Sequence, residues 1–103
     1  MGDWGTWEFD APLWRWEVVK DGSWHFVTVP PEISDEIDEM VGGRKGGFGS
    51  VRVEVRCGAT TWRTSVFPST AQEAFVLPVK LAVRKAEGLS AGAAATFVVT
   101  VLS

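Results

Sequence analysis

The sequence predicts a mainly β fold, a small closed or pseudo-closed barrel of about six mostly antiparallel strands with two capping helices. Apolar and polar residues alternate along 7–13 and 51–57, which is the period of half-buried strands. Apolar residues recur instead at helical spacing near 31–41 and 78–87. The connections are short, and closing such a strand set removes exposed sheet edges. We expect a single domain over residues 1–103.

The N-terminal segment predicts two strands, or one sharply bent strand. Apolar residues occupy odd positions from 7 to 13 and even positions from 14 to 18. A phase change of one residue beside Pro12 is typical of a bulge or tight bend. After a predicted turn at residues 20–22, the strand over 24–29 is apolar on both faces, as expected of a strand that is covered on each side.

The middle of the chain predicts a helix, a loop and a hairpin. Ile33 and Ile37 share one face of the helix near 31–41, and carboxylates occupy its other faces. Residues 42–49 contain five glycines and predict a loop. The strand over 51–57 then turns at Gly58 into a second strand over 60–67.

The last third predicts a short strand over 74–77, the helix near 78–87 and a final strand over 96–102. Pro78 suits the first turn of a helix, and Gly88 suits the residue just after its end. The apolar stripe of this helix consists of Val79, Ala82, Val83 and Ala86. We expect Trp24, Trp62 and Val83 in the core.

Several of these segments carry a resemblance to a known family. They are WHFVTVP (24–30), VRVEV (51–55), TWRTSVFP (61–68) and the helical stretch 75–92. Over about residues 6–102 the chain resembles the bacterial family catalogued as domain of unknown function 1905. The resemblance implies a small β-barrel with helical caps, joined in some members to a bacteriocin-protection (OmpD-associated) domain. It implies no activity.

Two details of the resemblance concern individual positions. It places Lys80 in a Leu-Pro-Val-Lys motif, which favours this lysine as a site residue. It also implies a tyrosine-like residue near Phe75 and a Gly-Asp pair before the last strand, where this chain has Gly92 and Ala93. These departures make the region more apolar and weaken the transfer of a polar site.

Composition and charge exclude several function classes. The 103 residues are 46% hydrophobic and 22% charged, with no apolar run long enough to span a membrane and no signal-peptide pattern. The single Cys57 excludes an internal disulfide and favours a cytoplasmic location. Residues 1–43 hold ten acids against two basic residues, and 44–103 hold eight basic residues against three acids. The net charge of −3 and the lack of a basic run argue against a nucleic-acid partner.

Six tryptophans without a tyrosine are the most unusual feature of the composition. Pointed into one barrel, they would line an apolar cavity for a small hydrophobic or aromatic ligand. Lys80 and Arg84 are spaced to bind an anionic group of that ligand, with Arg63 or Arg15 joining from a strand. The predicted ligand-binding residues are therefore Trp14, Trp16, Trp24, Phe26, Trp62, Arg63, Phe75, Lys80 and Arg84.

The leading hypothesis is thus a non-catalytic module that binds a small molecule in a Trp-lined barrel interior. A second hypothesis is a structural or protein-interaction domain with a solid core. A third is an enzyme, natural or engineered, that uses the same cavity with His25 or a carboxylate as acid or base. No residue set marks a catalytic site, and one histidine with one cysteine predicts neither a metal site nor a cofactor.

Overall fold

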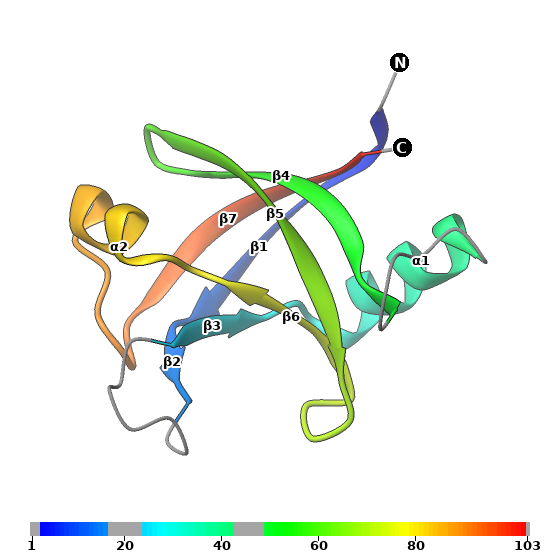
Figure 1. The fold of residues 1–103 in the computed structure, drawn as a ribbon, viewed down its shortest axis with the longest axis horizontal. Coiled ribbons are helices and arrows are strands. Elements are labelled where there is room, and N and C mark those ends of the chain that lie inside the picture. The colour runs from blue at the N-terminus through cyan, green and yellow to red at the C-terminus, as the bar shows by residue number, and fades with distance from the viewer. Residues whose placement is uncertain (1–2, 17–23, 43–48, 103) are drawn as a thin grey trace.

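The computed structural model describes residues 3–16, 24–42 and 49–102, which form seven antiparallel strands and two helices (Figure 1). The strands hydrogen-bond in the order β1-β7-β4-β5-β6-β3-β2. Along the chain the elements are β1 (Asp3–Pro12), β2 (Trp14–Arg15), β3 (His25–Thr28), α1 (Pro31–Val41), β4 (Val51–Cys57), β5 (Thr60–Ser69), β6 (Ala74–Pro78), α2 (Leu81–Glu87) and β7 (Ala94–Leu102).

The sheet curls into a half-barrel because its two outermost strands are successive parts of one bent segment. β1 pairs with β7 as far as Pro12, which lies opposite Ala94, and Trp14 of β2 already pairs with Phe26 of β3. Leu13 joins the two strands: its N–H donates to the carbonyl of Ala93 at 3.1 Å. The bend predicted beside Pro12 is confirmed.

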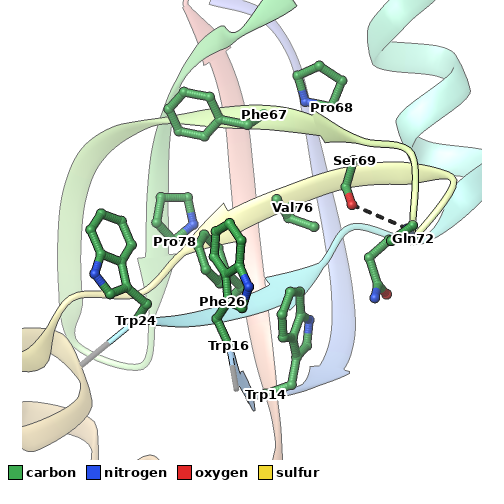
Figure 2. Close-up of a pocket in the computed structure, with 11 residues that line it drawn as sticks. Trp14, Trp16, Trp24, Phe26, Phe67, Pro68, Ser69, Gln72, Val76 and Pro78 are labelled. Carbon is green, nitrogen blue, oxygen red and sulfur yellow. Dashed lines mark hydrogen bonds between the residues drawn. The ribbon is translucent and has the colours of Figure 1, made fainter. Parts of the chain in front are cut away.

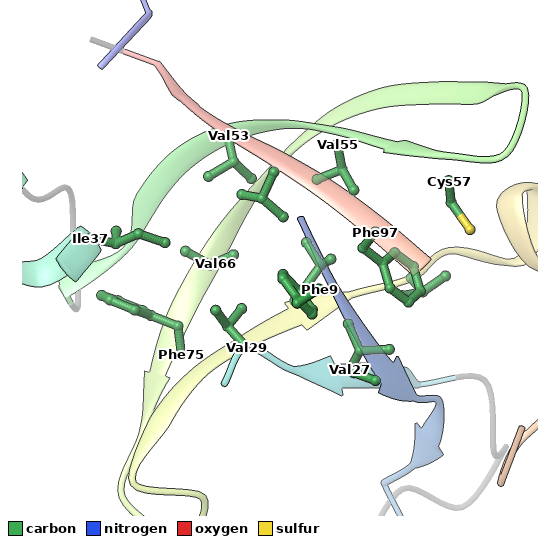
Figure 3. Close-up of a cluster of buried hydrophobic side chains, with 14 of the residues drawn as sticks. Phe9, Val27, Val29, Ile37, Val53, Val55, Cys57, Val66, Phe75 and Phe97 are labelled. Carbon is green, nitrogen blue, oxygen red and sulfur yellow. The ribbon is translucent and has the colours of Figure 1, made fainter. Parts of the chain in front are cut away.

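The interior of the half-barrel is filled by valine and phenylalanine side chains (Figure 3). The alternation of β4 is confirmed, since Val51, Val53, Val55 and Cys57 are all buried. Phe97 of β7 is completely buried, with its ring centroid 6.1 Å from that of Phe9 in β1. The hydrophobic contacts of this interior hold the strands together.

Helix α1 has the predicted bounds and packs against β6. Its buried face consists of Ser34, Ile37 and Val41. Ser34 is polar but fully hydrogen-bonded: its Oγ donates to the carbonyl of Val29 at 3.0 Å and accepts the N–H of Phe75 at 3.0 Å. One hydroxyl thus ties α1 to β6 and to the end of β3.

Helix α2 begins three residues later than predicted. Pro78 belongs to β6, opposite Phe26, and the N–H of Val79 donates to the carbonyl of His25 at 2.9 Å. Because these sheet contacts hold the backbone extended, the helix begins only after Lys80. Gly88 has the predicted left-handed conformation (φ 64°, ψ 36°). The predicted stripe is confirmed at Val79 and Val83, which are buried, and wrong at Ala82 and Ala86, which are exposed.

Two of the three residues expected in the core are buried. Trp62 and Val83 are 7% and 1% exposed, whereas Trp24 is 51% exposed. Trp24 and Phe26 are two residues apart, so their side chains point to the same side of the sheet, away from the interior. The predicted turn at 20–22 and most of the glycine-rich loop lie outside the described residues. Neither helix of the described chain has the length and hydropathy of a membrane span.

Candidate functional site

Three tryptophans gather around Phe26 of β3: Trp14 belongs to β2, and Trp16 and Trp24 lie directly next to the ends of β2 and β3. The ring centroid of Phe26 lies 5.2 Å from that of Trp14, 5.7 Å from Trp16 and 6.3 Å from Trp24. These are the separations at which aromatic rings attract each other in tilted or offset geometry. We call these four side chains the aromatic cluster. Four of the predicted ligand-binding residues are therefore close together.

The aromatic cluster lies on the outer face of the sheet and not in the barrel interior. Trp14 is paired with Phe26, and Phe26 with Pro78, so these side chains point to the same side. The neighbouring residues Val27 and Leu77 point to the opposite side, where they are completely buried in the core. The predicted interior location is therefore wrong for Trp14, Trp16 and Trp24, which cover the outer face, whereas Trp62 is buried in the core.

A pocket of about 460 Å³ lies between the aromatic cluster and the β5–β6 hairpin (Figure 2). We call it the aromatic pocket. Phe67, Pro68 and the hairpin residues Ser69, Ala71 and Gln72 form one wall, with Val76 and Pro78 beneath. These seven residues were not predicted. The sequence indicated that Phe67 points outward, because it does not share the alternation of the inward-facing positions 62, 64 and 66 in the same strand.

A chain of hydrogen bonds fixes one end of the aromatic pocket. The indole Nε1–H of Trp14 donates to the hydroxyl of Thr28 at 2.9 Å, and that hydroxyl donates to the Gln72 Oε1 at 2.9 Å. The backbone N–H of Gln72 in turn donates to the Ser69 Oγ at 3.2 Å. The tip of the hairpin and the aromatic cluster are therefore held at a set separation.

The described walls of the aromatic pocket contain no charged side chain. Trp16, Trp24 and Phe67 are 45%, 51% and 39% exposed around it. Large aromatic side chains grouped at the surface of a small domain are unusual, and such patches mark binding surfaces. The chemistry of this pocket is apolar contact and ring stacking.

A second pocket, of about 380 Å³, adjoins the first and shares Trp24 and Pro78 with it. We call it the basic pocket. Three cationic side chains line it, Arg63 of β5 together with Lys80 and Arg84 beside and on α2. The sequence prediction that these three meet is supported by their common pocket, whereas Arg15 is exposed and is not among the described lining residues.

Two of the three cations are held by neighbouring groups. The Arg63 Nε donates to the Glu54 carboxylate at 3.1 Å in an exposed ion pair. The Arg84 Nε donates to the carbonyl of Val79 at 3.1 Å. Trp62, the fourth predicted tryptophan, also lines this pocket and not the aromatic one.

Phe75 is the predicted site residue that belongs to neither pocket. Its side chain is 5% exposed and packs in the core, on the interior side of β6 (Figure 3). The reason is that successive side chains of β6 point to opposite faces of the sheet: Phe75 and Leu77 point inward, and Val76 and Pro78 point outward. The tyrosine-like residue expected at this position would thus belong to the core.

His25, the candidate acid or base, is one of the residues that line the basic pocket. Its Nδ1 is buried and has no hydrogen-bond partner among the described residues. Neither pocket has a carboxylate in its described walls, and no group of metal-ligating side chains occurs within residues 3–16, 24–42 and 49–102. The described walls of the two pockets therefore hold no assembled pair of acid and base.

The family model described as Domain of unknown function (DUF1905) matches residues 9–99, so the chain belongs to this family. The resemblance noted from the sequence is confirmed. No curated protein matches the chain. The family description names no activity.

Proposed function

We propose that this DUF1905 member is a non-catalytic binding module that takes a small apolar or aromatic molecule in the aromatic pocket. The observation that carries the proposal is the set of exposed aromatic side chains around an uncharged hollow. The proposal keeps the ligand class expected from the six tryptophans and moves the site from the barrel interior to the outer face.

The size and chemistry of the pocket support a small-molecule ligand. Its volume of about 460 Å³ is within the range typical of such sites. A ligand that covered Trp16, Trp24 and Phe67 would remove apolar area from water, which contributes roughly 25 cal/mol per Å². Flat rings also offer a stacking surface for a planar ligand.

Preorganisation supports the same proposal. The tryptophans pack on the buried ring of Phe26, and the Trp14–Thr28–Gln72 hydrogen bonds hold the opposite wall. A ligand would therefore order few additional side chains, and the entropy cost of binding would be correspondingly small. An enzyme in the same pocket has less support, because the described walls offer no carboxylate and His25 lies outside them.

The test uses N-phenyl-1-naphthylamine, a neutral aromatic dye whose fluorescence rises in apolar sites. We expect saturable binding to the wild-type protein. Phe67→Ala and Trp16→Ala should each weaken that binding by roughly tenfold, as loss of much of one buried aromatic contact implies. Met40→Ala is the matched control, since Met40 is 39% exposed on α1, away from both pockets.

Two outcomes contradict the proposal. The first is an absence of saturable dye binding to a protein whose circular dichroism and unfolding midpoint show it to be folded. The second is binding that Met40→Ala weakens as much as Phe67→Ala does, which indicates non-specific adsorption. Either result would favour the alternative of a structural or protein-interaction domain.

A further inference from the structure

We infer that the ligand is an aromatic acid whose ring occupies the aromatic pocket and whose anionic group lies in the basic pocket. This inference rests on the proposed function and specifies its ligand class. The two pockets share Trp24 and Pro78, so a single molecule extending past Trp24 contacts both. The anionic group is a carboxylate or a phosphate, because both accept hydrogen bonds from the same cations.

The charge distribution separates the two pockets sharply. No charged side chain lines the described part of the aromatic pocket, and every charged side chain that lines the described part of the basic pocket is cationic. The nearest acid that a contact identifies is Glu54, which reaches Arg63 from the neighbouring strand. A molecule with an apolar body and one anionic end matches this pattern, whereas a cationic or neutral molecule matches only half of it.

The backbone places the three cations from two directions. Arg63 comes from β5, where it pairs with Glu54 of β4. Lys80 precedes α2, and Arg84 follows it by one turn, with its Nε on the Val79 carbonyl. The bond from the Val79 N–H to the His25 carbonyl fixes this corner against β3, the strand that carries Phe26. Backbone hydrogen bonds of the fold therefore fix the position of the basic pocket relative to the aromatic cluster.

Neither half of the ligand suffices for tight binding. Exposed ion pairs contribute little in water, so a small anion without a ring gains little from Lys80 and the partly neutralised Arg63. A neutral ring gains apolar contact but has no group that interacts with the cations of the basic pocket. Joining the two lets the ring bring the anion to the cations without a second loss of translational freedom.

The test compares two dyes that differ by one charged group. 8-Anilinonaphthalene-1-sulfonate has the ring system of N-phenyl-1-naphthylamine plus a sulfonate, which serves as the probe anion. We expect the anionic dye to bind the wild-type protein roughly fivefold more tightly at low salt, and the ratio to fall towards one at about 0.5 M salt. The neutral dye should be insensitive to salt.

Substitutions test whether the preference for the anionic dye depends on the basic pocket. The double variant Arg63→Gln/Lys80→Gln should bring the two dyes to equal affinity and leave the neutral dye unchanged. Lys85→Gln is the matched control, because Lys85 is an exposed cation of α2 that is not among the described residues lining the pocket. Displacement of the anionic dye by 1-naphthaleneacetate or by 1-naphthyl phosphate then tells a carboxylate ligand from a phosphate ligand.

The possible failures are distinguishable. If neither dye binds, the proposed function is wrong. If the neutral dye binds as tightly as the anionic one, or if Lys85→Gln equalises the dyes as fully as the double variant does, the proposed function stands and the aromatic-acid inference is wrong. Equal displacement by 1-naphthalenemethanol and by 1-naphthaleneacetate would overturn the inference in the same way.

Discussion

Strands β3 and β6 have two apolar faces that differ in kind. Their inner face carries Val27 and Leu77, which are completely buried among the other valines of the interior. Their outer face carries Phe26 and Val76, which are buried only beneath exposed tryptophans and Phe67. The inner face is a packed core made of aliphatic and phenylalanine side chains. The outer face is a half-open surface made of aromatic rings.

The difference shows that burial alone does not identify a core. Phe26 is 5% exposed and Phe97 is fully buried, yet only Phe97 belongs to the contiguous hydrophobic cluster of the domain. A side chain in that cluster is surrounded on all sides, so its removal leaves a cavity. A side chain on the outer face has water or a ligand on one side, so its removal changes binding more than folding.

The first prediction applies one substitution to each face. Phe97→Ala should lower the free energy of unfolding by about 4 kcal/mol, because it leaves a cavity in a packed interior. Phe67→Ala, on a residue that is 39% exposed, should cost about 1 kcal/mol or less. Urea unfolding followed by circular dichroism measures both values. Similar costs for the two variants would mean that the outer face is part of the core.

The second prediction compares two serines, Ser34 in the buried contact between α1 and β6 and Ser69 in the wall of the aromatic pocket. Ser34→Ala should lower the free energy of unfolding by about 2 kcal/mol, because the Val29 carbonyl and the Phe75 N–H would lose a partner in a buried setting. Ser69→Ala removes a single bond to the backbone N–H of Gln72 at the less buried hairpin and should cost about 0.5 kcal/mol. Equal costs would show that the link between α1 and β6 contributes little.

Much of the fold could be predicted from the sequence. Helix α1, strand β4, the hairpin at Gly58 and the bend beside Pro12 occur where the patterns place them. These elements depend on local signals: alternation, apolar residues at helical spacing, a phase change beside a proline, and a glycine at a turn. The start of α2 was predicted three residues too early, because the pairing of Pro78 with Phe26 depends on a strand that lies far away in the sequence.

The location of the site could not be predicted from the same signals. An alternating pattern separates two faces of a strand but does not say which face meets the core when both are apolar. Trp24 and Phe26 were therefore placed inside, together with Phe75, and only Phe75 is in the core. Ser34 carried a usable signal, because it shares the helical spacing of Ile37 and Val41. The contribution of Phe67 and Gln72 to the pocket depends on how the hairpin folds over β3.

The last and smallest predicted effect uses Cys57 to test how dry the inner face is. Burial raises the pKa of the Cys57 thiol above its ordinary value of 9.0, and the nearby Glu87 carboxylate raises it further. The folded protein thus holds the thiol proton more tightly than the unfolded chain does. This contribution to stability is complete below pH 9.0 and is lost as the pH rises through the folded-state pKa. The difference in unfolding free energy between wild type and Cys57→Ala should therefore shrink above pH 9.0. Taking the difference cancels groups that titrate alike in both proteins. A difference that stays constant with pH would show that water reaches the thiol, and that the inner face is less distinct from the outer one than its packing indicates.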